Sequence, residues 1–235
     1  MHISMAFLNP GDKALIPNPG YPTYQSITRL VEAEPVFYDL KAEHQWQPDL
    51  EALDQMDLTA VKLMWINYPH MPTGANAQKD TFEKLVAWAK EKDILLVNDN
   101  PYSFVLTDQP QSMMSVPGAM EVGMELNSLS KSFNMAGWRV GMVLGNEENI
   151  NAVLKVKSNM DSGMFYGIQQ GAIAALQAQE SWFEKLNDIY RQRRKLIFEL
   201  ASLLNTDFDA HNSGLFVWAK MRDTSKSSVE YIEEI

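Results

Sequence analysis

The chain alternates short apolar runs with segments in which apolar residues recur at helical spacing. This alternation is typical of βαβ units, in which a helix returns the chain so that successive strands lie parallel in one sheet. The runs predicted to be strands are Lys13–Pro17, Pro35–Asp39, Ala60–Asn67, Ile94–Val97, Val122–Leu126 and Arg139–Leu144. We therefore predict an α/β fold: a mostly parallel sheet with helices on both faces.

After Gly145 the pattern becomes helical. Ser181 and Glu184 have the spacing of a capping box, which predicts a long helix running to about Leu204. We expect a large domain in residues 1–180, a connecting helix in 181–204 and the start of a small α/β domain in 205–235, with a strand at Leu215–Ala219. Ser227 and Glu230 form a second capping box.

Both ends of the chain have the form of interrupted elements. Met1–Leu8 reads as the end of an apolar helix, and a helix begun at Ser227 has room for only about two turns, too few to be stable alone. We expect a piece of a longer protein, lacking the N-terminal part of the large domain and most of the small one.

Composition excludes several function classes. A formal net charge of −10 disfavours nucleic acid and anionic membrane as partners. With no cysteine and four histidines far apart, we expect no thiolate chemistry and no metal site. No apolar run approaches the length of a membrane span and no signal peptide pattern begins the chain, so we expect a cytoplasmic protein.

Lys131 lies among small, hydroxyl and apolar residues, with no other charge before Arg139. Removing water from an ammonium group favours the free amine, which can attack a carbonyl carbon. The Ser128 and Ser130 hydroxyls and the Arg139 guanidinium are donors suited to a phosphate. An amine nucleophile beside a phosphate clamp is what a pyridoxal 5'-phosphate enzyme requires, so these residues predict that cofactor.

Asp99 follows a strand predicted to be buried, at the edge of the sheet where ligands of α/β proteins bind. Its carboxylate there can pair with a protonated ring nitrogen; the alternative is a turn aspartate beside Pro101. Tyr102 stands three residues later, where its hydroxyl can reach the ring oxygen of the cofactor, or the side chain can simply be part of the core. Tyr21, on a rigid turn, can stack on a planar ring or serve as turn packing.

Arg139 opens an apolar strand, so its guanidinium needs an anionic partner if the strand is buried. Phosphate is one such partner and a structural salt bridge is the alternative. We interpret His70 as a structural group of its loop rather than as a catalyst.

Together these residues resemble the class I/II aminotransferases of the fold-type-I pyridoxal phosphate enzymes. The resemblance rests on the turn Asn18–Tyr24, the proline-rich loop Asn67–Gly74, Asp99–Tyr102, and Ser128–Lys131 with Arg139, in this order. The proline-rich turns and paired serines look closest to the branch that contains LL-diaminopimelate aminotransferase.

The resemblance implies a role for each position and a homodimer with amino acid and 2-oxo acid substrates. Lys131 would be the Schiff-base lysine and the base that moves the proton. Asp99 would pair with the pyridinium nitrogen, and Tyr102 with the phenolic oxygen. Ser128, Ser130 and Arg139 would hold the phosphate, and Tyr21 would cover the ring.

The sequence departs from the family at Met71, where the residue before Pro-Thr-Gly is normally an asparagine that donates to the phenolic oxygen. A thioether cannot donate, so that oxygen would rely on Tyr102 and on Asn67. The family's first phosphate-binding turn and its carboxylate-binding arginine are also missing from this chain. We therefore expect it to bind the cofactor weakly and to transaminate poorly.

Three functions remain open at this stage. The leading one is an aminotransferase that exchanges an amino group between an amino acid and a 2-oxo acid. A pyridoxal phosphate lyase or decarboxylase on the same scaffold is the second, because a fold does not fix a reaction. The third is a non-catalytic module derived from such an enzyme.

Overall fold

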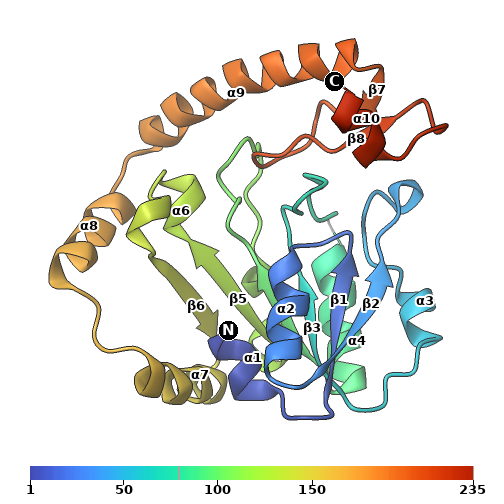
Figure 1. The fold of residues 1–235 in the computed structure, drawn as a ribbon. Coiled ribbons are helices and arrows are strands. Elements are labelled where there is room, and N and C mark those ends of the chain that lie inside the picture. The colour runs from blue at the N-terminus through green and yellow to red at the C-terminus, as the bar shows by residue number, and fades with distance from the viewer. Residues whose placement is uncertain (79, 235) are drawn as a thin grey trace.

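The computed structural model describes residues 1–78 and 80–234 and is built around a six-stranded sheet with the order β2-β1-β3-β4-β5-β6 (Figure 1). The strands are β1 (Lys13–Asn18), β2 (Glu34–Asp39), β3 (Val61–Ile66), β4 (Leu95–Asp99), β5 (Gly123–Ser128) and β6 (Gly141–Gly145). The first five are parallel to their neighbours, and β6 runs antiparallel to β5. The mostly parallel sheet predicted from the sequence is confirmed.

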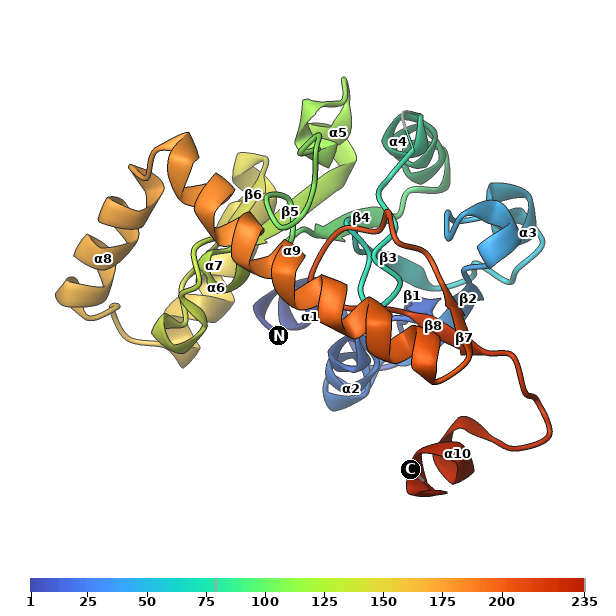
Figure 2. The ribbon, with the colours of Figure 1, turned by 90° about the horizontal axis from the view of Figure 1, so that it is seen from above.

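Helices cover both faces of this sheet, as Figure 2 shows from above. One face is covered by α1 (His2–Phe7), α2 (Pro22–Leu30) and α7 (Glu147–Met160), and the other by α3 (Leu50–Asp54), α4 (Thr81–Lys92) and α5 (Ala119–Val122). Side chains alternate between the faces along each strand. In β4, Leu96 therefore packs in the core that contains α4, whereas Val97 packs in the core that contains α2. Because both faces are buried, β3 and the first three residues of β4 are almost continuously apolar.

The remaining elements are short or follow the sheet. They are the four-residue helix α6 (Leu129–Ser132), the 3-10 helices η1 (Ala42–His44), η2 (Met113–Ser115) and η3 (Ala136–Trp138), and then α8 (Tyr166–Leu176), α9 (Glu180–Leu203), β7 (Thr206–Phe208), β8 (Ala219–Met221) and α10 (Ser228–Glu234). In Figure 1, α9 arches above the ends of the sheet to which the parallel strands point. Among the described residues, no helix combines the length and the apolar character that crossing a membrane requires.

The long helix α9 has the extent predicted from the sequence, but its start differs. Gln179 is the N-cap and makes no side-chain capping bond, so Ser181 lies inside the first turn and the capping box predicted there is wrong. The box at Ser227 is present: the Ser227 amide donates to Glu230 Oε2 at 2.8 Å, and the Glu230 amide donates to Ser227 Oγ at 3.3 Å. The domain boundaries proposed from the sequence stay predictions.

The strand predicted at Leu215–Ala219 is wrong, because β8 begins only at Ala219. Residues 212–216 instead form a strap across the edge of the sheet at which the parallel strands end. The Asn212 side chain donates to the Thr73 carbonyl at 2.6 Å, and the Ser213 amide donates to the Gly74 carbonyl at 2.7 Å. The backbone of this segment is thus bonded to loops of the sheet rather than to a neighbouring strand.

Arg194 of α9 fixes the strap from the other side. Its guanidinium donates to the carbonyl oxygens of Asn212 and Gly214. The Gly214 amide donates in turn to the Val105 carbonyl, in the loop after β4, at 2.9 Å. The strap therefore connects the long helix to two loops at the end of the sheet.

Gly74 is required where the strap meets the proline-rich loop. Its φ of 74° lies in the left-handed region, which side chains with a Cβ rarely adopt. A Cβ atom at this position would also lie 2.7 Å from Asn212 Cβ and from the Ser213 carbonyl oxygen. Both the backbone conformation and the close approach of the strap therefore favour glycine.

We predict that Gly74→Ala lowers the free energy of unfolding more than the same change at a glycine that has only a positive φ. Gly11 has a φ of 88°, and a Cβ atom added there would meet nothing within 4 Å, so Gly11→Ala should cost only the backbone term, roughly 1–2 kcal/mol. Gly74→Ala should cost about 1–3 kcal/mol more, because the strap must move. Urea unfolding of both variants measures the difference, and equal losses would contradict the role of the strap.

Candidate active site

The ends of the parallel strands surround a cavity of about 360 Å³. The strand order reverses between β1 and β3, and such a switch point is where ligands of open α/β sheets bind. All eight site residues predicted from the sequence line this cavity: Tyr21, Asn67, Asp99, Tyr102, Ser128, Ser130, Lys131 and Arg139. The structure thus brings together residues that lie up to 118 positions apart in the chain (139 − 21). Their chemical roles stay predictions.

Asp99 is the last residue of β4, and its side chain faces the core that contains α2. Its Oδ2 accepts a 2.8 Å hydrogen bond from the Tyr24 hydroxyl. Burial raises the pKa of the Asp99 carboxyl, and the hydrogen bond from Tyr24 opposes this shift. The Tyr24 hydroxyl is a neutral donor, so its hydrogen bond orients one oxygen of the Asp99 carboxylate without supplying a positive charge. The carboxylate is therefore still able to attract a cation.

Tyr24 is a site residue that the sequence analysis missed. It lies in α2, its ring stacks on Trp65 at a centroid distance of 4.8 Å, and burial raises its own pKa well above the ordinary value. The hydroxyl therefore stays protonated and donates to Asp99. The signal in the sequence was weak: a tyrosine three residues after Tyr21, on the first turn of a helix, is as typical of a core position.

The side chain of Asn67 links the ends of β3 and β4. Its Nδ2 donates to the Asp99 carbonyl oxygen at 2.5 Å, and its Oδ1 accepts from the Met71 amide at 2.7 Å. Asn67 is therefore engaged with the backbone at both ends of its amide. The Met71 side chain also lines the cavity, where its thioether supplies no hydrogen-bond donor.

Lys131 is half-buried in α6, the four-residue helix that begins after β5. No hydrogen-bond or ion-pair partner of Nζ is found among residues 1–78 and 80–234, so the amine is available to a ligand. Ser128 caps this helix, since its Oγ accepts from the Ser130 amide at 3.1 Å. This cap fixes the start of α6, so that Ser128, Ser130 and Lys131 all line the cavity.

Arg139 differs from its prediction. The strand β6 begins at Gly141, and Arg139 precedes it with an exposed side chain and a φ of 54°. Its Nη1 donates to the Ala136 carbonyl at 3.0 Å. The argument that a buried strand forces an anionic partner on this arginine is therefore wrong, although the side chain still lines the cavity and has N–H groups without a partner among the described residues.

Aromatic side chains form two further walls. Tyr21 is 43% exposed and packs edge-on against Tyr24 at 5.7 Å between ring centroids. Tyr102 is buried, and burial together with the nearby charge of Asp99 raises its pKa to about 12, so its hydroxyl is a donor at neutral pH. Phe216 of the strap meets Tyr102 edge-on at 6.3 Å, which places a residue of the C-terminal part in the cavity wall.

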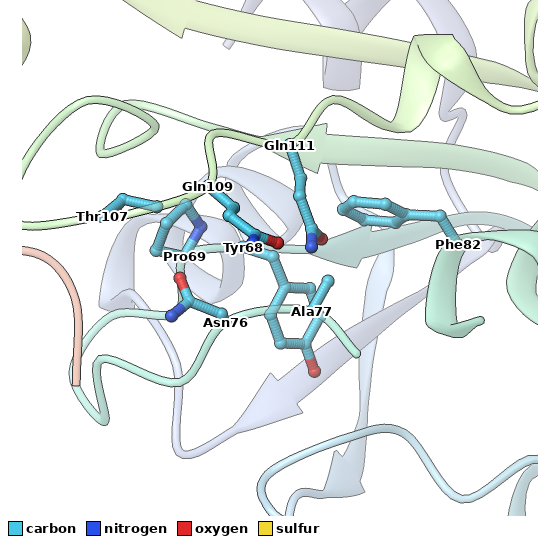
Figure 3. A pocket seen from close by; sticks show the side chains of 8 residues that line it. All are labelled: Tyr68, Pro69, Asn76, Ala77, Phe82, Thr107, Gln109 and Gln111. Atoms are coloured by element: carbon cyan, nitrogen blue, oxygen red, sulfur yellow. The ribbon is translucent and has the colours of Figure 1, made fainter. Parts of the chain in front are cut away.

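A second, much smaller cavity lies beside the site, below the loop that follows β4. Gln109 and Gln111 point from that loop toward Tyr68 and Pro69 (Figure 3). Its volume of about 10 Å³ has room for a single water molecule at most. Across the described residues, no three His, Asp or Glu side chains are grouped so that they could hold a metal ion.

His70 lies next to the site in the proline-rich loop and is buried. Its Nδ1 shares a 2.7 Å hydrogen bond with Thr73 Oγ1, whereas Nε2 is buried without a partner among the described residues. Burial lowers the pKa of His70 to about 4, and the Pro19 backbone opposes the shift. These contacts fit the structural role predicted for it.

We predict that His70 makes the protein less stable in mild acid. Between its folded pKa of about 4 and the unfolded value of about 6.5, the unfolded chain binds more protons, so stability falls as the pH is lowered through this window. The loss should reach about 3 kcal/mol and should disappear in His70→Asn. Urea unfolding from about pH 7 to about pH 4 measures it. The exposed His211→Asn variant is the control, and the same pH slope in all three proteins would refute the prediction.

Comparison with known proteins places this chain in a family. A profile of the aminotransferase class I and II family matches residues 1–234. The chain is 43% identical over 230 residues to LL-diaminopimelate aminotransferase of Gloeobacter violaceus, covering 97% of this chain and 59% of that protein. It is 38% identical over 233 residues to LL-diaminopimelate aminotransferase of Aquifex aeolicus, covering 98% and 60%. The chain belongs to the aminotransferase class I and II family.

Solved structures agree. The apo structure of BacF from Bacillus subtilis superposes with a TM-score of 0.92 at 39% identity and covers 99% of this chain and 60% of that one. An aromatic aminotransferase from Pyrococcus horikoshii superposes with a TM-score of 0.90 at 27% identity, covering 99% and 63%. The fold is thus that of the fold-type-I aminotransferases, as the sequence predicted. The chain spans about 60% of the length of the curated relatives named above.

Proposed function

We propose that this chain is the cofactor-binding part of a pyridoxal-phosphate-dependent aminotransferase, which exchanges an amino group between an amino acid and a 2-oxo acid. The observation that carries the proposal is that one cavity is lined by a half-buried aspartate, a set of phosphate donors and a lysine with no partner among the described residues. The volume of about 360 Å³ lies in the usual range of small-ligand sites. The relatives named above are mostly aminotransferases, so we propose transamination rather than the lyase or decarboxylase reaction.

The residues present fit pyridoxal 5'-phosphate. When bound, the cofactor would supply an aldehyde and a ring that accepts electrons. Lys131 would bind the aldehyde carbon through Nζ and, once released by substrate, move a proton at that position. Asp99, held by Tyr24, would keep a proton on the ring nitrogen, because its carboxylate favours a neighbouring cation.

The other residues would position the ring. Ser128 and Ser130 would donate to the phosphate from the start of α6, and Arg139 has N–H groups left over for the same anion. The Tyr102 hydroxyl would donate to the phenolic oxygen, and Tyr21 would cover one face of the ring. The Asn67 amide holds the Asp99 and Met71 backbones, and its second Nδ2 hydrogen would donate toward the phenolic oxygen.

Substrate, assembly and location are parts of the same proposal. The named relatives favour LL-diaminopimelate as the first amino donor to test. The homodimer follows from the family resemblance, and the cytoplasmic location follows from the sequence pattern described above. The participation of Phe216 suggests that the strap contributes to the wall that substrate side chains meet.

The proposal is tested by covalent labelling of this chain. We predict that borohydride reduction in the presence of pyridoxal 5'-phosphate attaches a pyridoxyl group to Lys131, because its amine is half-buried beside phosphate donors. Peptide mass mapping locates the label. Lys131→Ala should abolish it, and Lys155→Ala, at an exposed position of α7, should leave it unchanged. Labelling spread evenly over surface lysines would overturn the proposed function.

We also predict that Met71 raises the pH at which the nitrogen joining Lys131 to the cofactor loses its proton. The reason is that the phenolic oxygen of the bound cofactor receives one hydrogen bond fewer. Met71→Asn restores a donor and should lower that pH by about one unit or more, the effect of one hydrogen bond to a charged acceptor. Met71→Leu keeps the size but adds no donor and should match the parent chain. Spectral titration of the three proteins decides the matter, and equal midpoints would reject the prediction.

A further inference from the structure

Glu125 is a buried carboxylate that the proposed reaction does not use. It lies in β5, directly opposite Asn98 of β4, and only 3% of its surface is exposed. Its Oε2 accepts from Asn98 Nδ2 at 2.9 Å and from the Met113 amide at 2.8 Å. Its Oε1 accepts from Ser112 Oγ at 2.8 Å and from Asn100 Nδ2 at 3.2 Å.

The four donors come from two segments, residues 98–100 and 112–113. Two of them, Asn98 and Asn100, make further hydrogen bonds of their own. Asn98 Oδ1 accepts from the Tyr68 amide at 3.2 Å, which ties in the residue after Asn67. Asn100 Nδ2 also donates to the Gln111 carbonyl at 2.9 Å, and Asn100 Oδ1 accepts from Ser103 Oγ at 2.6 Å. Glu125 is therefore the centre of a network that joins the end of β4 to both ends of the loop that follows it.

This network lies on the opposite face of the sheet from the Asp99 side chain. Asn98 and Asn100 precede and follow Asp99, and alternation along the strand directs their side chains away from the Asp99 side chain. Asp99 bonds Tyr24 of α2 on one face, while its two neighbours bond Glu125 on the other. Tyr102 lies two residues beyond Asn100. The Glu125 carboxylate thus holds the backbone segment that carries Asp99 and Tyr102, and it does so from the opposite face of the sheet.

The chemistry of the network requires a carboxylate at this position. An ionised carboxyl group only accepts hydrogen bonds, and its two oxygens can accept about four. All four partners of Glu125 are donors, and the amide oxygens of Asn98 and Asn100 are already engaged. No lysine, arginine or histidine of the described residues forms an ion pair with it. A buried charge without a cation is expensive, so neutral donors must stabilise it.

We propose that Glu125 is a positioning residue that sets the geometry of Asp99 and Tyr102 from the far face of the sheet. The inference rests on the proposed function, because it assigns Glu125 to the same reaction. An amide in place of the carboxylate would turn an N–H group toward the donors of the network. The end of β4 and the start of its loop would then move, and the two residues that contact the cofactor ring would lose their alignment.

The first test needs no cofactor. Amide hydrogen exchange is measured in the parent chain, in Glu125→Gln and in Ser112→Ala, which removes only the Ser112 Oγ donor and leaves the bonds of Asn98 and Asn100 in place. We expect Glu125→Gln to raise exchange at residues 98–100, 102–103 and 67–68, and to leave β1 and α2 protected. Ser112→Ala should raise exchange only around residue 112. A uniform rise over the sheet in Glu125→Gln, or the same pattern in both variants, would overturn the proposal.

The second test uses the label on Lys131. The pyridoxal 5'-phosphate concentration that gives half-maximal labelling should rise about tenfold in Glu125→Gln and less than about twofold in Ser112→Ala, since only the first loses an acceptor bonded to both neighbours of Asp99. Unchanged half-saturation in folded Glu125→Gln would reduce Glu125 to a structural role and refute the inference.

A variant that retains the charge keeps the inference testable if Glu125→Gln does not fold. Glu125→Asp shortens the side chain but remains acceptor-only, so it should fold and show the same local exchange pattern with a smaller shift in labelling. Uniform loss of protection in Glu125→Asp would overturn the positioning role. Absence of labelling in the parent chain would sink the proposed function, whereas the exchange pattern would still decide whether Glu125 holds the end of β4.

Discussion

The arrangement of the site depends on how one half-buried carboxylate, that of Asp99, is stabilised. Asp99 ends a strand that is covered on both faces, so its charge needs a hydrogen-bond donor before it is useful to a ligand. Tyr24 supplies that donor, and the stacking of its ring on Trp65 fixes the hydroxyl in place. A neutral donor stabilises the carboxylate without neutralising it. In the proposed function, this carboxylate is the group that would pair with the ring nitrogen of the cofactor.

The C-terminal part reaches this site through backbone hydrogen bonds. The strap at residues 212–216 bonds the loops after β3 and β4, and Arg194 binds two of its carbonyl groups from α9. These bonds place Phe216 against Tyr102. The position of the long helix and the shape of the cavity are consequently coupled. A ligand that contacts Phe216 in this cavity therefore contacts both the strap and the loops of the sheet.

Sequence reasoning succeeded where the order of elements alone decides the outcome. Parallel strands end at one edge of a sheet, so Asp99 and Lys131, each in a segment that follows a predicted strand, had to converge. It failed where tertiary contacts decide. Tyr24 could equally have been a core residue, Arg139 turned out to be exposed, and the backbone of Leu215 bonds no strand because the strap crosses the sheet edge instead.

Glu125 illustrates the same limit in another form. In the sequence it is one acidic residue in an apolar strand, and nothing nearby announces its partners. Its four donors lie 12 to 27 positions away and meet only when β4 and β5 pair. The carboxylates of Asp99 and Glu125, on adjacent strands, thus act on opposite faces of the sheet. Asp99 presents its charge to the cavity, and Glu125 uses its charge to hold the strand that carries Asp99.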